Sequence, residues 1–134
     1  MIPIRGLGRC ACFVLILGGF VGCGGGQTVK TFPVEGTVTL DKKPLEKGTI
    51  YFKTVETGAL DTLDIRDGKF HGQASEGQRR VEIVSYETKI MGTGAMKGEV
   101  QFNLIPPKYN SESKLTETVK PGGPNQFTFD LASK

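Results

Sequence analysis

The sequence has 134 residues, of which 19 are glycine and 7 are proline, and it contains no tryptophan. Turn-forming residues this frequent break the chain too often for a helical bundle and favour short strands. Beyond residue 22 the chain carries 15 Lys and Arg against 14 Asp and Glu, because Arg5 and Arg9 come earlier. This near-neutral balance, with the charges scattered along the chain, predicts no nucleic-acid partner.

The N-terminal segment has the plan of an export signal. Arg5 and Arg9 precede an apolar run over residues 11–21. The run covers about half of the roughly 20 residues that a membrane-spanning helix needs. We therefore expect a signal peptide over residues 1–22, with a permanent transmembrane helix as the weaker alternative.

The end of this segment, Phe20-Val21-Gly22-Cys23, resembles the bacterial lipoprotein box, although Phe20 replaces the usual Leu. In that family a small residue precedes the cysteine that is acylated and becomes the mature N-terminus. The glycine-rich stretch that follows fits an acylated Cys23 with a flexible tether over residues 23–33. The resemblance implies an exported protein, lipid-anchored to the cell envelope at the outer membrane or periplasmic face. An ordinary secretory peptide that leaves Cys23 free is the alternative.

The remaining chain, residues 34–132, is predicted to form one all-β domain. The three cysteines of the chain, Cys10, Cys12 and Cys23, all precede this domain. The domain therefore has no disulfide and depends on an apolar core. Apolar and polar residues alternate with a period of two in the first three expected strands, which are residues 34–40, 48–54 and 63–65. The Asp67-Gly68 pair then predicts a tight hairpin turn, and the next strand begins at Phe70.

The second half of the domain has a less regular pattern. Residues 79–88 carry apolar side chains on both faces, which predicts a central strand or a bulge. Residues 89–98 are broken by glycine and predict a long mobile connection. Further strands are expected at residues 100–104, 115–119 and 127–131. Strands this short, without a helical segment between them, predict a seven- to eight-stranded antiparallel β-sandwich.

Two segments of the domain resemble known families. Residues 34–52, VEGTVTLDKKPLEKGTIYF, resemble the opening of carboxypeptidase regulatory-like domains, which have a transthyretin-like sandwich fold, although Lys42 replaces the usual Gly. Residues 104–131 are similar to the C-terminal signature of small exported lipoproteins of planctomycete-type bacteria, although Glu117 stands where an apolar residue is common. The resemblance implies a fold and a location but no reaction.

The residue types for catalysis are sparse. His71 is the only histidine, and no serine lies in a G-x-S-x-G setting, so we interpret His71 as a solvated strand-end residue. Asp61, Asp64 and Asp67 recur every third residue, but a strand turns them to alternate faces and they do not match a calcium loop. We interpret them as a solvated edge and expect no catalytic site, metal or cofactor.

Residues 104–115 form the most distinctive segment. Pro106 and Pro107 cannot donate ladder hydrogen bonds, and Asn110 can satisfy backbone groups in a turn. Tyr109 is predicted to cover the open end of the sandwich while its hydroxyl keeps a polar partner. We therefore expect these residues to be structural anchors rather than a ligand loop.

The sequence thus predicts a non-enzymatic lipoprotein of the cell envelope whose β-sandwich is a structural or binding module. We expect the N-terminal lipid to attach the protein to the membrane. One alternative is an adhesin-type surface module that binds a glycan or a protein, and a remote one is a hydrolase that uses His71.

Overall fold

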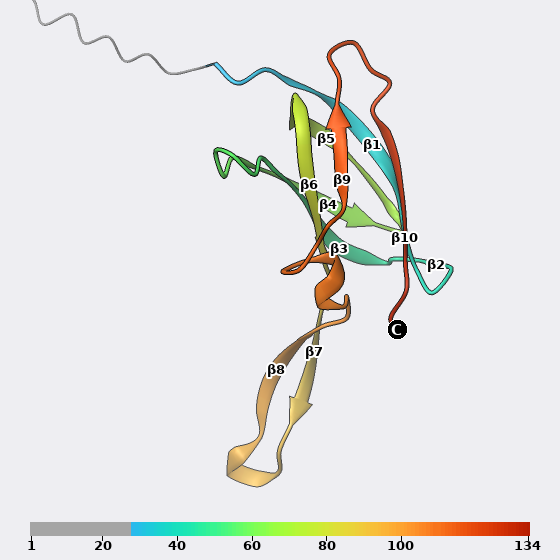
Figure 1. Cartoon of the computed structure of the whole chain (residues 1–134). Coiled ribbons are helices and arrows are strands. Elements are labelled where there is room, and N and C mark those ends of the chain that lie inside the picture. The colour runs from blue at the N-terminus through green and yellow to red at the C-terminus, as the bar shows by residue number, and fades with distance from the viewer. Residues whose placement is uncertain (1–27) are drawn as a thin grey trace, which may run out of the picture.

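The computed structural model describes residues 28–134, so the predicted signal peptide and the acylation site Cys23 lie outside the described residues. The described chain contains strands and short 3-10 helices but no α-helix, which confirms the all-β prediction. No helix in this part of the chain is long and apolar enough to span a membrane. The elements, labelled in Figure 1, are β1 (Thr31–Leu40), β2 (Lys43–Pro44), β3 (Lys47–Lys53), β4 (Leu60–Arg66), β5 (Lys69–Ser75), β6 (Gly77–Val84), β7 (Tyr86–Met91), η1 (Gly94–Met96), β8 (Gly98–Asn103), η2 (Pro107–Tyr109), β9 (Thr116–Val119) and β10 (Gln126–Leu131).

Most strands belong to one curled sheet with the order β10-β1-β5-β4-β3-β6-β9, in which β2 also pairs with β1. The predicted hairpin turn is confirmed between β4 and β5, where Asp67 and Gly68 have φ angles of 50° and 72°. Register pairing between β4 and β5 is confined to Arg66 opposite Lys69. Because β4 and β5 diverge beyond the turn, the two halves of the sheet face one another.

The core lies between these two halves. Phe52 of β3 packs against Phe70 of β5 and Phe127 of β10, with ring centroids 6.1 and 5.9 Å apart. Gly36 makes room for this cluster, because a Cβ there would overlap the Phe127 carbonyl oxygen and lie 2.6 Å from the Phe70 ring. The buried apolar side chains are Val34, Val38, Leu45, Ile50, Phe52, Ile65, Phe70, Ala74, Val81, Ile83, Ile105, Val119, Phe129 and Leu131.

One strand pair departs from the predicted antiparallel arrangement. β10 runs parallel to β1, with Glu35 opposite Gln126 and Leu40 opposite Leu131. The chain reaches this position through residues 120–125, which carry it from β9 across to the start of β1. Asn125 holds this connection against β1. Its side-chain amide donates to the Pro33 carbonyl at 3.1 Å, and its backbone carbonyl accepts the Glu35 N–H at 3.0 Å.

The central strand expected over residues 79–88 is confirmed as β6, which lies between β3 and β9, but its predicted extent was wrong. It ends at Val84, after which buried Ser85 separates β6 from β7. The expected mobile connection at 89–98 is largely paired, since Lys89 lies opposite Val100 and Met91 opposite Gly98 in a β7–β8 hairpin. This hairpin projects away from the body of the protein (Figure 1).

Candidate functional site

The β7–β8 hairpin is the most unusual surface of the protein. We call residues 86–104 the arm, and every residue in it is exposed. Large apolar side chains in the arm are between 39% (Phe102) and 88% (Met96) exposed. An isolated two-stranded hairpin is marginally stable in water, and contiguous exposed apolar surface commonly marks an interaction site. The arm is therefore the candidate functional site.

Hydrogen bonds hold the base of the arm to the body. The Asn103 side-chain oxygen accepts the backbone N–H groups of Ser85 and Ile105, both at 3.1 Å. The Ser85 hydroxyl donates to the Lys47 carbonyl at 2.7 Å, and the Leu104 N–H donates to the Ser85 carbonyl at 2.7 Å. Because Ser85 and Ile105 are both buried, the two strands leave the body from fixed positions.

The two faces of the arm differ in character. On one face Val100 and Phe102 of β8 are followed by Leu104, just beyond the strand, and we call these three residues the apolar row. Glu87 and Lys89 lie beside the row on β7 and form an ion pair at 3.2 Å, with the Lys89 nitrogen 6.0 Å from the centre of the Phe102 ring. The other face carries Tyr86, Thr88, Ile90, Glu99, Gln101 and Asn103.

The apolar row continues into a hollow at the base of the arm. This hollow has a volume of about 540 Å³ and includes Leu104 in its wall. Leu40, Pro44 and Leu45 form its apolar side on the body. The surface available to a partner therefore extends from the arm onto the corner between β1 and β3.

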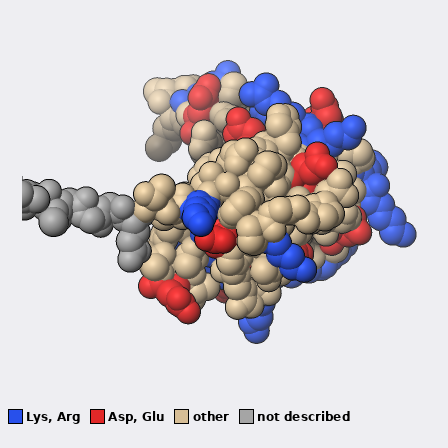
Figure 2. Space-filling model, turned by 90° about the horizontal axis from the view of Figure 1, so that it is seen from above, with Lys and Arg blue, Asp and Glu red and all other residues tan. Residues whose placement is uncertain are grey.

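Comparisons of the chain with known protein families, with curated protein sequences and with solved structures found no match. On the face shown in Figure 2, basic and acidic side chains lie interspersed around an uncharged centre.

The aspartates expected at a solvated edge do not all lie there. Asp64 and Asp67 are exposed, but Asp61 lies on the inner side of β4 with Leu63 and Ile65. Its carboxylate contacts Arg79, which is 1% exposed and was not singled out from the sequence. Arg79 shares the parity of Val81 and Ile83 on β6, and this inward phase is the signal that predicts its burial.

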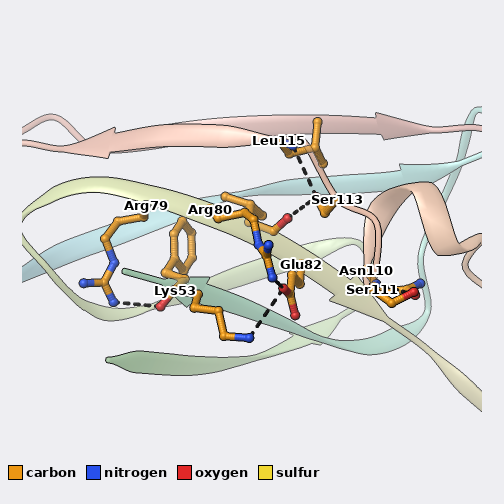
Figure 3. A network of polar contacts seen from close by, with 10 residues as sticks. Lys53, Arg79, Arg80, Glu82, Asn110, Ser111, Ser113 and Leu115 are labelled. Carbon is orange, nitrogen blue, oxygen red and sulfur yellow. Dashed lines mark hydrogen bonds and ion pairs between the residues drawn. The ribbon is translucent and has the colours of Figure 1, made fainter. Parts of the chain in front are cut away.

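A second polar network lies on the outer side of β6 (Figure 3). The Glu82 carboxylate forms an ion pair with the Lys53 ammonium at 3.7 Å and a closer ion pair with the Arg80 guanidinium. Nearby, the Ser113 hydroxyl donates to the Val81 carbonyl at 2.5 Å and accepts the Leu115 N–H at 3.2 Å. These contacts connect β6 with the segment that leads into β9.

The predicted anchor residues lie where the arm returns to the body. Pro106 precedes η2 and Pro107 begins it. The Asn110 side-chain amide donates to the Ile105 and Pro106 carbonyls, both at 3.0 Å. Tyr109 is partly buried against the core, and its hydroxyl accepts the Ala132 N–H at 3.2 Å.

His71 is exposed as predicted, but it lies within β5 and not at a strand end, opposite Glu35 in the register of β1. The two residues line a hollow of about 790 Å³, and the Gln126 side chain donates to the Glu35 carboxylate at 2.7 Å. No serine lines this hollow. Within residues 28–134, no group of three His, Cys, Asp or Glu side chains is placed to hold a metal ion.

Proposed function

We propose that the protein is an exported, lipid-anchored module of the cell envelope that presents its arm to a protein partner. The body would be a transthyretin-like sandwich in the manner of carboxypeptidase regulatory-like domains, and it would act without catalysis. The observation that carries the proposal is the apolar row, whose side chains Leu104, Phe102 and Val100 are between 39% and 42% exposed although they would stabilise the protein more if fully buried.

The position of the arm supports this role. The start of β1 and the tip of the arm lie at opposite ends of the protein (Figure 1). If Cys23 is acylated, its tether enters the body at the start of β1. The tip of the arm would then lie at the end of the protein opposite this attachment point.

The chemistry of the arm favours a protein over a glycan. Glycan sites combine aromatic rings with polar groups that bind hydroxyls, whereas the apolar row has one ring between two aliphatic side chains. A protein partner can cover such a row with its own apolar side chains and can also pair with an open strand edge.

The lipid anchor is tested by mass spectrometry of the protein recovered from membranes. We expect a mature N-terminus at Cys23 with attached acyl chains. Recovery of the unprocessed chain, or of a processed chain with a free Cys23 thiol in the medium, would refute the anchor.

The binding role of the arm is tested with a photo-crosslinking amino acid in the full-length chain in living cells. Met96, at the tip of the arm, is replaced in one variant, and Val55, an exposed apolar residue of the β3–β4 connection, is replaced in the other; they are 88% and 72% exposed. We expect a discrete protein adduct from position 96 and none from position 55. The absence of an adduct at position 96, or the same adducts at both positions, would contradict the proposal.

A further inference from the structure

The edge of β7 that faces away from β8 has no strand partner in residues 28–134. The Leu104 N–H donates to the Ser85 carbonyl, so residues in phase with Ser85 direct their backbone groups toward β8. The alternate residues Tyr86, Thr88 and Ile90 therefore direct their N–H and carbonyl groups to the open edge. Such an edge is a template for another strand.

The side chains along this edge are self-complementary about Thr88. When a second β7 pairs antiparallel with Thr88 opposite Thr88, Glu87 of each copy lies opposite Lys89 of the other. Tyr86 likewise lies opposite Ile90. Opposite charges, an aromatic beside a β-branched side chain, and paired threonines are all favourable cross-strand combinations.

The neighbouring registers are unfavourable. A shift that keeps the outward backbone groups paired centres the contact on Glu87 or on Lys89. The first shift sets two carboxylates directly opposite one another, and the second does the same with two ammonium groups. Like charges in directly opposite positions destabilise a strand pair, so the charge pattern selects the register centred on Thr88.

The same pairing joins the tip of one arm to the base of the other. Met91 and Met96 are exposed at the tip, and the hollow of about 540 Å³ lies at the base beside Leu45 and Leu104. Methionine side chains are flexible and fill irregular apolar spaces well. Each copy would thus supply apolar side chains to the hollow of its partner.

We propose that two copies of this chain associate through the β7 edge to form a four-stranded sheet with the order β8-β7-β7-β8. The two copies are related by a twofold axis through Thr88, and each uses the same surface. This inference names the partner of the arm and therefore rests on the proposed function.

Disulfide formation in the full-length chain tests the register. Thr88→Cys places two thiols across a hydrogen-bonded antiparallel pair, where the Cα atoms are about 5.5 Å apart and within disulfide reach. Gln101→Cys is the matched control, because Gln101 lies opposite Thr88 on β8. The two control thiols would be three strand spacings apart, roughly 14 Å. Under mild oxidation of cells we expect covalent dimers from position 88 above the background of the native chain and of position 101.

Charge exchange tests whether the contact is between copies. In the Thr88→Cys chain, Glu87→Lys sets lysines opposite one another and Lys89→Glu does the same with glutamates. We expect each variant alone to lose at least about tenfold of the covalent dimer. Co-expression of the two variants with tags of different size should restore only the mixed dimer. Neither variant regains its own Glu87–Lys89 ion pair on mixing, so restoration reports pairing between copies.

Three results would overturn the proposal: equal dimer from positions 88 and 101, charge variants that cross-link like their parent, or co-expression that restores no mixed dimer. If any of these results occurs while position 96 still captures a different protein, the self-pairing is wrong and the proposed function stands. If position 96 captures no protein, both are wrong.

Discussion

Arg79 and Asp61 form an ion pair on the inner side of the curled sheet. The Nη2 atom of Arg79 lies 2.5 Å from the Oδ2 atom of Asp61. Arg79 also donates to the Phe52 carbonyl at 2.7 Å, and Asp61 accepts the Ser75 backbone N–H at 2.8 Å. The pair therefore connects β6 with β3, β4 and β5. Removing the carboxylate would leave the guanidinium buried with an uncompensated charge.

We predict that Asp61→Ala lowers the free energy of unfolding by about 3 kcal/mol, because breaking a buried pair from one side exposes the desolvation penalty of the other. Asp64→Ala is the control on the same strand. Asp64 is exposed, so its replacement should change stability by less than about 0.5 kcal/mol. Urea denaturation of the purified chains measures both values, and equal losses would show that the buried pair has no special role.

Tyr109→Ala should lower the free energy of unfolding by about 2 to 4 kcal/mol, because the ring is partly buried against the core. Tyr109→Phe keeps the ring but loses the hydrogen bond from Ala132, and it should lower stability by only about 1 kcal/mol. Thermal denaturation distinguishes the two variants. Unchanged stability with loss of partner capture would make Tyr109 a recognition residue instead of an anchor.

The hydrogen bond between Ser133 and the Asp41 carboxylate should be lost in acid. The backbone N–H of Ser133 donates to its carboxylate at 2.9 Å, and this bond, with further contributions from the Ser133 hydroxyl and from Lys134 and Lys108, holds the pKa of Asp41 below its ordinary value of 3.8. A lowered folded-state pKa means that the bond stabilises the C-terminus above pH 3.8 and is lost as the pH falls through the lowered pKa. The Ser133 amide resonance should therefore titrate with a midpoint below 3.8 and should not titrate in Asp41→Asn. A midpoint at or above 3.8 would contradict this assignment.

The apolar row should be dispensable for folding. Because Val100 and Phe102 are exposed, the double variant Val100→Thr/Phe102→Thr should change the free energy of unfolding of the body by less than about 1 kcal/mol. Phe70→Ala, which empties a core position of β5, should lower it by about 3 to 5 kcal/mol. A large loss from the arm variant in chemical denaturation would mean that the row packs against the body.

The sequence predicts those parts of the fold that local chemistry determines. Alternation identifies the inward residues of β1 and β3, and the Asp67-Gly68 pair identifies the turn before β5. The parallel partnership of β10 with β1 has no comparable local signal, because it depends on the path of residues 120–125 and on Asn125. Period-two patterns are the same for parallel and antiparallel neighbours.

The arm was missed for a related reason. Val100, Phe102 and Leu104 alternate with polar residues whether they face a core or a partner, so the pattern predicts a strand but not its exposure. Buried Arg79 and Asp61 could have been found together, since each lies in the inward phase of its strand and they carry opposite charges. That inference requires the two strands to be placed in one core, which the sequence pattern alone does not do.

The central claim, that the arm binds a protein, is tested most directly by the yield of partner adducts from position 96 in living cells. The yield is compared between the otherwise native chain, the Val100→Thr/Phe102→Thr variant and the Leu60→Thr variant. Leu60 is an apolar residue of the body that is 50% exposed, so its replacement is the control. We predict that the arm variant loses most of the adduct while Leu60→Thr retains it, with all three chains folded and equally abundant. Equal adduct yields from all three chains would contradict the claim.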